Sequence, residues 1–516
     1  MKVYILHNSI FRVSPAGQAG SLFDIHFSDI VYLLTVITSL MIEIMKKLRF
    51  TLYARVLVFV FSCQLVVVRA QQAEAWLTNA DRSALFAKQS HKLSFILSNS
   101  GSDKAVIHVD EKQSYQSIDG FGFCLTGGSA QHIMKMDKAS RAALLKDVFG
   151  TSGNAIGVSY LRLSIGASDL NDRVFSYDDL PEGETDPEMK RFDLGQDKLD
   201  VIPVMKEILQ INPSIKILGS PWSPPVWMKN NNDTRGGRLR PEAYPAYAKY
   251  FVRYIQDMKK QGITIDAITV QNEPLHPGNN PSLLLPAPDE ADFIKNHLGP
   301  AFKKAGIKTK IILYDHNCDR PDYPISILDD AEAKKYIDGS GFHLYGGPIT
   351  AMTDVHNAHP DRALYFTEQM VVQEDNTSPL GIANPVRRLI IGATSNWSRN
   401  VLLWNLAADP ENKPFTDRGG CPMCQGAVTI DGNKVTNNIA YYAIAHASKF
   451  VRPGAVRIES TSADSLSNVA FKTLDGKKVL IVVNDANKAQ TFTIENNGKR
   501  AIAQLEAKAV GTYIWK

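Results

Sequence analysis

Two glutamates follow apolar, strand-like runs and have the chemistry to cleave a glycosidic bond together. Glu273 lies in Gln271-Asn272-Glu273-Pro274, directly after the run 267–270, and Glu368 follows the run 363–366. Pro274 restrains the backbone of the residue before it, which fixes the edge at which Glu273 stands. One carboxyl group of such a pair donates a proton to the departing oxygen, while the other attacks the anomeric carbon or activates water. We therefore predict that Glu273 and Glu368 are catalytic.

Each glutamate also has a simpler interpretation. An acid after a strand often stands at a helix N-terminus, where it complements the helix dipole. Asn-Glu-Pro is also a short motif. The prediction therefore depends on whether the fold brings both acids to one place.

Eight short, β-branched runs alternate with helical patterns between residues 116 and 428. The runs are 117–125, 156–162, 215–218, 267–270, 310–313, 340–344, 363–366 and 400–403. Eight βα units of this size favour an α/β fold of the (β/α)₈ TIM-barrel type. Glu273 then follows the fourth strand and Glu368 the seventh. Both face the carboxyl edge of the barrel, where such folds place their active sites.

Alternating strand patterns fill the chain after residue 429, with Asp475-Gly476 as a hairpin signal. We expect an appended β-sandwich at 429–516, joined by the N-terminal segment 71–115, so that both chain ends build it. The predicted organisation is a leader at 1–70, the segment 71–115, a catalytic barrel at 116–428 and the sandwich.

Aromatic residues near the predicted strand ends suit a sugar site. Trp222, Trp227, Trp397 and Trp404 offer flat apolar faces for the C–H face of a sugar, with core packing as the alternative. Tyr345, beyond the sixth strand, can hydrogen-bond the nucleophilic carboxylate. His343 beside it is at least as compatible with a structural role.

The charge distribution argues against a polyanionic partner. Residues 1–70 carry seven basic and three acidic residues, which account for the whole net charge of +4. The rest of the chain is therefore neutral overall, without the basic excess typical of nucleic-acid binding.

The leader predicts export to the periplasm or the extracellular space. Residues 45–70 have the pattern of a signal peptide, with a basic start at Lys46, Lys47 and Arg49 followed by the apolar run 56–68. The run is short for a bilayer span, so we expect no stable span in the mature chain. Cys63 is a weak candidate for lipid attachment. We interpret Met45 as the true start and residues 1–44 as an over-extended reading frame. A second membrane anchor at the apolar run 30–42 is the less favoured alternative.

Cys421 and Cys424 enclose Pro422-Met423. No second Cys or His pair has zinc-finger spacing, and no thioredoxin-like pattern surrounds them. We expect a local disulfide or two loop thiols, and no metal or cofactor.

The motifs together resemble glycoside hydrolase family 30, over nearly all of the mature chain. They are Asp119-Gly120-Phe121-Gly122, Leu161-Arg162-Leu163-Ser164, Ser220-Pro221-Trp222-Ser223, Trp227-Met228-Lys229, Gln271-Asn272-Glu273-Pro274, Glu368, Trp404-Asn405-Leu406-Ala407 and His446-Ala447-Ser448-Lys449-Phe450. The resemblance implies a retaining mechanism with Glu273 as acid/base and Glu368 as nucleophile. It also implies a sugar subsite, whose lining residues are Arg162, Trp222, Asn272, Tyr345 and Trp404.

One departure bears on specificity. Where glucosylceramidase-like members carry an Asp after Met-Thr on the first strand, this chain has Leu125-Thr126-Gly127-Gly128. An acid for the distal hydroxyls of a terminal sugar is then missing, which suits a cleft where the glucan chain continues. The segment 416–424 is expected to shape the same rim.

The expected function is retaining hydrolysis of β-glucosidic linkages in a glucan, oligosaccharide or glucoside. The enzyme is either a glucosylceramidase-family β-glucosidase or an endo-β-1,6-glucanase. Alternatives are a non-catalytic glycan-binding protein and a relative acting on β-xylosyl, β-fucosyl or galactosyl linkages. The sequence leaves the oligomeric state open.

Overall fold

The computed structural model describes residues 27–45, 71–97, 105–373 and 379–516. Residues 1–69 and 70–516 form two separate compact units. The first unit contains helix α1 (Phe27–Met45). Within the described ranges, no helix combines the length and apolarity needed to cross a bilayer. The predicted signal sequence after Met45 and the candidate lipid site Cys63 lie outside the described residues.

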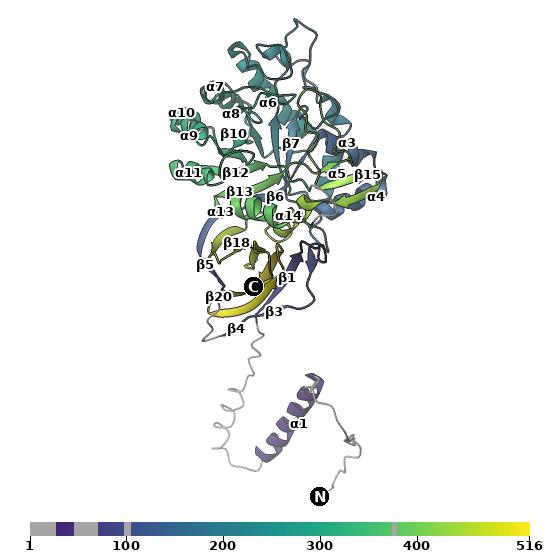
Figure 1. The fold of residues 1–516 in the computed structure, drawn as a ribbon, viewed down its shortest axis with the longest axis vertical. Helices are drawn as coiled ribbons and strands as arrows, with labels where there is room; N and C mark the ends of the chain where they lie inside the picture. Colours follow the sequence, from purple (N-terminus) through teal and green to yellow (C-terminus); the bar gives the residue numbers. More distant parts are fainter. Residues whose placement is uncertain (1–26, 46–70, 98–104, 374–378) are drawn as a thin grey trace. The chain divides into compact units, whose positions relative to one another are not determined.

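Eight parallel strands close into a barrel, which confirms the predicted architecture (Figure 1). Closure comes from pairing of the last strand with the first, from Asn400 opposite Gly120 to Leu403 opposite Phe123. The strands are β6 (Gly120–Leu125), β7 (Tyr160–Ile165), β8 (Lys216–Pro221), β9 (Ala267–Thr269), β10 (Lys310–Asn317), β11 (Gly339–His343), β12 (Ala363–Glu368) and β13 (Ser398–Leu403).

The barrel interior is a packed core. One cluster of buried side chains comes from six of the barrel strands and includes Tyr160, Leu218, Ile312 and Leu402. Strands buried on both faces read as continuous apolar runs, which is why the sequence pattern located all eight. The second run differs in detail, because its strand begins at Tyr160 and not at residue 156.

Helices surround the barrel, and some of them begin at side-chain caps. Asp137 accepts backbone hydrogen bonds from Ala139 and Ser140, and Thr126 accepts one from Ser129. The helices are α3 (Gly127–Lys135), α4 (Lys138–Phe149), α5 (Val201–Ile211), α6 (Tyr244–Lys260), α7 (Ala287–Phe293), α8 (Gly299–Ala305), α9 (Asp322–Asp329), α10 (Ala331–Lys334), α11 (Ala351–Ala358), α12 (Ala383–Pro385), α13 (Gly392–Ser395) and α14 (Ile439–Ser448), with π-helical turns η4 (Ile294–Leu298) and η5 (Val386–Ile391).

The β-sandwich takes strands from both chain ends, as predicted. Its strand order is β2-β1-β22-β19-β18-β17-β5-β20-β21-β4, with β3 paired to β1. The N-terminal strands are β1 (Gln72–Thr78), β2 (Ala87–Lys88), β3 (Leu93–Ser94), β4 (Ile96–Leu97) and β5 (Val106–Ser117). The C-terminal ones are β17 (Val456–Ser460), β18 (Leu466–Lys472), β19 (Lys478–Asn484), β20 (Gln490–Asn496), β21 (Lys499–Leu505) and β22 (Val510–Trp515). A separate small sheet contains β14 (Ala407–Ala408), β15 (Val428–Asp431) and β16 (Lys434–Asn437).

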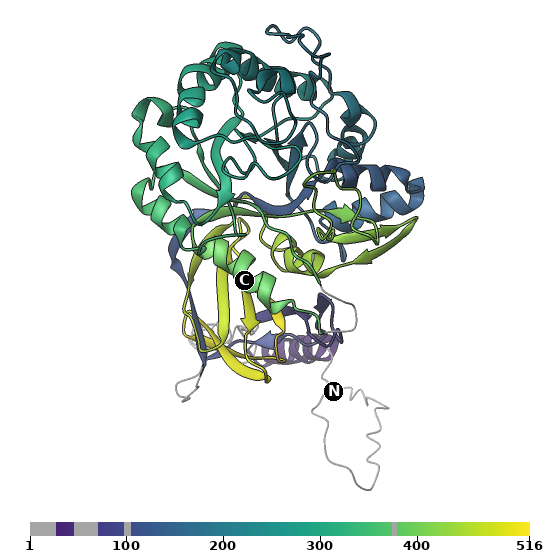
Figure 2. The same ribbon diagram turned by 45° about the horizontal axis from the view of Figure 1, so that its top comes forward.

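Helix α14 joins the barrel to the sandwich (Figure 2). Its buried His446 is hydrogen-bonded at 2.8 Å to Thr78 Oγ1 of β1 through Nε2, and at 2.8 Å to Thr512 Oγ1 of β22 through Nδ1. One side chain thus ties the helix to two neighbouring strands of the sandwich, one from each end of the chain. Residues 70–516 form one compact unit, so the domain boundaries drawn at 115/116 and 428/429 stay predictions.

Candidate active site

Glu273 stands just beyond β9 in a left-handed backbone conformation, with φ of 46°. Its backbone N–H donates to Asp315 O at 3.0 Å, which ties it to the neighbouring strand β10. A positive φ is uncommon for a residue with a side chain and often marks a functional position. The side chain is buried and reaches His343 on β11.

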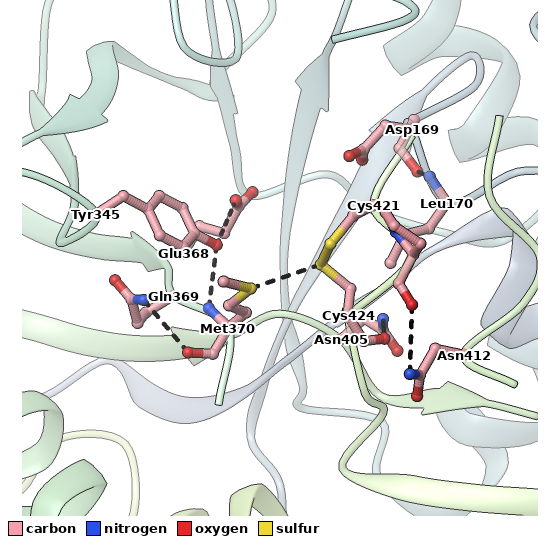
Figure 3. Close-up of a disulfide and its surroundings, with 12 residues drawn as sticks. Asp169, Leu170, Tyr345, Glu368, Gln369, Met370, Asn405, Asn412, Cys421 and Cys424 are labelled. Atoms are coloured by element: carbon pink, nitrogen blue, oxygen red, sulfur yellow. Dashed lines mark hydrogen bonds between the residues drawn. A yellow bond between two sulfur atoms is a disulfide. The ribbon is translucent and has the colours of Figure 1, made fainter. Parts of the chain in front are cut away.

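Glu368 is the last residue of β12, and both of its carboxylate oxygens have donors. Tyr345 O–H donates to Oε1 at 3.0 Å, and Arg162 Nη1 of β7 donates to Oε2. The predicted contact of Tyr345 with this carboxylate is present in the structure (Figure 3).

A single imidazole nitrogen brings the two acids together. His343 Nδ1 lies 3.0 Å from Glu273 Oε1 and 3.8 Å from Glu368 Oε1. Glu273 Oε1 and Glu368 Oε1 therefore lie no more than about 7 Å apart. This distance is compatible with the separation of about 5 Å between the two carboxyl groups of retaining enzymes. The fold thus brings the two glutamates into one site at the carboxyl edge of the barrel.

Arg162 and Asp315 form the charged floor beneath the pair. Arg162 Nη2 donates to Asp315 Oδ2 at 2.7 Å and to Asn272 Oδ1 at 2.7 Å, and both charged side chains are completely buried. Asp315 also accepts from Thr367 at 2.6 Å. Burial raises the pKa of Asp315, but the charge of Arg162 and the hydrogen bonds from His343 and Thr367 outweigh burial and hold it below the usual range.

His343 carries a positive charge at neutral pH. Burial lowers its pKa, but the charge of Glu368 and the hydrogen bonds to Asp315 and Glu273 raise it to about 9. The imidazolium then donates Nδ1–H to Glu273 and Nε2–H to Asp315, at 3.0 and 3.1 Å. The sequence left His343 open to a structural role, and its contacts instead place it among the charged groups of the site.

The two acids differ in the direction of their pKa shifts. Burial raises the pKa of Glu273, but the hydrogen bond and charge of His343 outweigh it, so the net shift is downward. Burial also raises the pKa of Glu368, and the charges of His343 and Arg162 offset only part of this. In the site without substrate, the shared proton of the pair therefore favours Glu368.

Glu273, His316 and His343 are the residues that come nearest to a metal-ligand set, with donor atoms within 4.8 Å of one another in the described ranges. A ligating histidine must be neutral. Both ring nitrogens of His343, however, are hydrogen-bonded to carboxylates, at 3.0 Å to Glu273 and 3.1 Å to Asp315. A metal ion here would have to displace one of these hydrogen bonds together with a proton of His343.

The four candidate tryptophans separate into two groups. Trp222 and Trp404 pack against each other at the site, with ring centroids 5.3 Å apart, and both are almost fully buried. The Arg162 guanidinium lies over the Trp222 ring at 4.8 Å. Trp227 and Trp397 are not part of this cluster. Trp227 donates to Asp178 at the loop after β7, and Trp397 precedes β13 at the opposite barrel edge, where it stacks on His356 at 3.7 Å. For Trp397 the structure therefore favours core packing, the second of the two expected alternatives.

Asp169 is a site residue that the sequence reasoning missed. It follows β7, its carboxyl is buried, and it lies close enough to both glutamates for their charges to act on it. Its pKa is raised by burial and by the charges of Glu368 and Glu273. The chain lacks an acid after β6, as expected, but Asp169 supplies one after the next strand. Its position soon after an apolar run was the sequence signal that could have identified Asp169.

The loop between β14 and β15 borders this site and contains the disulfide Cys421–Cys424. Of the two expected states, a local disulfide and two loop thiols, the structure therefore shows the disulfide. Thr416 N–H donates to Asp169 O at 2.9 Å, and Cys424 lies beside Met370, two residues beyond Glu368 (Figure 3). The segment 416–424 thus shapes the rim, as predicted.

Fold and site together define a glycoside hydrolase on a (β/α)₈ barrel. The glycosyl hydrolase family 30 TIM-barrel domain model matches residues 118–451, and the family's beta sandwich domain model matches residues 454–513. The chain therefore belongs to glycosyl hydrolase family 30.

Named relatives fall into two activity groups. An endo-1,6-beta-D-glucanase from Neurospora crassa is 32% identical over 450 residues, covering 83% of this chain and 92% of the relative. Lysosomal acid glucosylceramidase from Mus musculus is 26% identical over 441 residues, covering 80% and 83%. The solved structure of an endo-beta1,6-glucanase has 32% identity and a TM-score of 0.79, covering 86% of this chain and 99% of that one.

Proposed function

We propose that this enzyme hydrolyses β-1,6-linked glucan chains with retention of anomeric configuration. The observation that carries the proposal is the convergence of Glu273 and Glu368 on His343 Nδ1. The choice of substrate is supported by relatives named endo-1,6-beta-D-glucanase, which are 31–32% identical, against 26–28% for those named glucosylceramidase.

In this mechanism Glu368 attacks the anomeric carbon and forms a covalent glycosyl-enzyme. Glu273 protonates the departing sugar oxygen and later deprotonates the attacking water. Arg162 and Tyr345 hold both oxygens of Glu368 in position for attack. Asn272, whose Oδ1 accepts from Arg162, offers its amide N–H group to the 2-hydroxyl of the sugar.

The remaining assigned residues shape the sugar subsite. Trp222 and Trp404 form its apolar wall, and Trp222 also supports the Arg162 guanidinium. With Arg162, Asn272 and Tyr345, they would fix the sugar in a single orientation over Glu368.

The proton of the pair must lie on Glu273 when the substrate is bound. In the free site it favours Glu368 because protonated His343 stabilises ionised Glu273. His343 Nδ1 faces both acids, so it can give its proton to Glu273 and take one from Glu368. The net change moves one proton from Glu368 to Glu273, His343 stays protonated, and the Glu368 carboxylate retains the donors Arg162 and Tyr345.

Two variants test these roles. Glu368→Gln should lose at least about a thousandfold in kcat on every substrate, because no nucleophile remains. Glu273→Gln should lose at least about a hundredfold on β-1,6-glucan. It should keep turnover of dinitrophenyl β-gentiobioside, whose leaving group needs no proton.

The measurements are initial rates on both substrates, with NMR to follow the anomeric configuration of the first product. Equal residual activity of the two variants on both substrates would contradict the assigned roles. An inverted first product would contradict retention.

An exo-acting β-glucosidase is the second candidate, favoured by Asp169. A buried acid beside the pair can hold the distal hydroxyls of a terminal sugar, which an exo-acting enzyme requires. Product profiling on β-1,6-glucan, β-1,3-glucan, gentiobiose and glucosylceramide separates the candidates. Early release of mixed oligosaccharides supports endo cleavage, whereas glucose as the sole early product supports exo cleavage.

The same assays, extended to β-xylosyl, β-fucosyl and galactosyl substrates, would also reveal a binding protein or an enzyme for a different sugar. Glycan binding without any reducing-end release would indicate a binding protein. Cleavage confined to β-xylosyl, β-fucosyl or galactosyl substrates would indicate a different sugar specificity.

We also infer that the enzyme acts outside the cytoplasm. The basic start and apolar run at 45–70 support export, and the Cys421–Cys424 disulfide fits an oxidising compartment. N-terminal sequencing of the protein from cell fractions tests this. A cytoplasmic product that retains residues 45–70 would overturn it.

A further inference from the structure

The Cys421–Cys424 disulfide lies beside the nucleophile half of the site (Figure 3). Cys424 is 3% exposed, and its Sγ lies 3.8 Å from Met370 Sδ. Met370 follows Glu368 by two residues, directly beyond the end of β12. The cross-link therefore contacts the segment that carries the nucleophile.

One route from the disulfide to Glu368 runs through Met370 and Tyr345. Met370 N–H donates to Tyr345 Oη at 3.0 Å, and Tyr345 O–H donates to Glu368 Oε1 at 3.0 Å. The position of the Met370 backbone thus helps to fix the hydroxyl that holds the carboxylate. Displacement of Met370 would weaken both hydrogen bonds, since each depends on the same oxygen.

A second route runs through the aromatic wall. Cys424 is packed in one apolar cluster with Trp222 and Trp404, and Cys421 packs against its edge. Trp404 N–H donates to Gln369 O at 2.9 Å, immediately after Glu368. Trp222 in turn supports Arg162, which is paired with the other oxygen of Glu368. Both carboxylate oxygens of Glu368 are therefore connected to the disulfide through packed neighbours.

The loop around the disulfide has no helix or strand of its own between residues 409 and 427. Its other ties include the packing of Phe415 in the same cluster, hydrogen bonds such as Thr416 to Asp169, and the exposed ion pair of Arg418 and Asp233. An exposed ion pair contributes little to stability. Within the described ranges, the cross-link is the only covalent constraint on this loop beyond the backbone itself.

We propose that the Cys421–Cys424 disulfide is a positioning element for Glu368, and that its reduction lowers turnover reversibly. The inference rests on the proposed role of Glu368 as nucleophile. Packing in this region sets the distance between the nucleophile and the sugar. Misplacement by about 1 Å can cost about a hundredfold in rate.

The redox step is an ordinary thiol–disulfide exchange. Dithiothreitol supplies two thiols, the Cys421–Cys424 bond breaks, two protein thiols form, and the reagent becomes its cyclic disulfide. Cys421 is partly exposed, so the reagent can reach its sulfur. Cys124 and Cys318 are buried free thiols and give the reagent no other disulfide to open in the described part of the chain.

The experiment measures kcat and KM of the folded enzyme on β-1,6-linked gluco-oligosaccharides before and after reduction, and again after reoxidation. Mass spectrometry of alkylated protein reports whether the cross-link is open. We expect reduction to lower kcat about tenfold with KM changed by less than about twofold, and reoxidation to restore kcat. This pattern means that the transition state, and not substrate binding, depends on the cross-link.

Two variants serve as controls. The double variant Cys421→Ser/Cys424→Ser should show the lowered kcat and no response to dithiothreitol. Cys318→Ala should respond to dithiothreitol as the unmodified enzyme does. If the double variant fails to fold, reduction of the folded unmodified enzyme decides the question.

Two results would overturn the inference alone: unchanged kcat with the cross-link shown to be open, or a rise in KM with kcat unchanged. Absence of activity on every β-glucoside before reduction would overturn the proposed function and this inference with it.

Discussion

At the scale of single residues, His343 decides how charge is distributed over the catalytic pair. It lies between Glu273 and Asp315, and its Nδ1 is also 3.8 Å from Glu368. Its positive charge acts to lower the pKa of both glutamates. In Glu273 this effect outweighs burial, whereas in Glu368 burial prevails and the pKa is raised. The pH dependence of the enzyme should therefore depend on this side chain.

We expect His343→Gln to move both limbs of the pH profile of kcat/KM to higher pH. Loss of the imidazolium raises the pKa of Glu368, so the ionised nucleophile forms only at higher pH. It also raises the pKa of Glu273, which then keeps its proton to higher pH. The measurement is kcat/KM on β-1,6-gluco-oligosaccharides from pH 4 to 9.

His316→Gln is the matched control, because burial lowers the pKa of His316 to about 4 and the residue is neutral over most of this range. Its profile should move less than that of His343→Gln. Unmoved limbs in His343→Gln would show that this histidine does not set the charge of the pair.

At the scale of elements, the first two barrel strands approach as closely as their backbones allow. A Cβ atom on Gly122 of β6 would lie 1.9 Å from Tyr160 O and 2.8 Å from Val158 Cγ1. Gly122 pairs with Tyr160 of β7 and with Leu402 of β13, so it belongs to the segment that closes the barrel. A side chain at this position must push a backbone carbonyl aside.

Gly122→Ala should lower the free energy of unfolding by about 3 kcal/mol, the upper end of the usual cost of overpacking. Urea denaturation followed by tryptophan fluorescence measures it. Gly381→Ala is the control, because its Cβ would make only an ordinary contact of 3.7 Å with Ile439. Equal stability of the two variants would show that β6 and β7 can separate without cost.

At the scale of the whole molecule, a neutral histidine connects the two layers. His446 of α14 bonds Thr78 and Thr512, which come from opposite ends of the chain. Burial lowers its pKa to about 3, well below the ordinary 6.5. The folded protein therefore excludes a proton that the unfolded chain accepts below about pH 6.5.

Stability should consequently fall as the pH drops from 6.5 toward 3, with His446 contributing about 1.4 kcal/mol per pH unit. His446→Gln should reduce the slope of unfolding free energy against pH by this amount, whatever its stability at pH 7. Urea denaturation at intervals between pH 7 and 4 measures the slope. The same slope in both proteins would mean that His446 takes up a proton in the folded state.

The sequence by itself determined the fold class and the identity of the two catalytic candidates. Eight buried parallel strands give continuous apolar runs, and polar residues after such runs face the barrel mouth. Glu273, Glu368 and Tyr345 could therefore be found from their place after a run. The pattern left Trp397 open between the site and core packing, because it does not separate the two edges of a barrel sharply enough.

Only the tertiary structure decided what surrounds the pair. Asp315 lies in β10 where its backbone and that of Tyr314 have positive φ and the pairing with β11 shifts register, so its inward direction could not be predicted from alternation. Asp169 and the Cys421–Cys424 loop reach the site through contacts between segments far apart in the chain. The physical reason is that local patterning fixes which face of an element is buried, whereas charge pairing at the site depends on distances that only closure of the barrel sets.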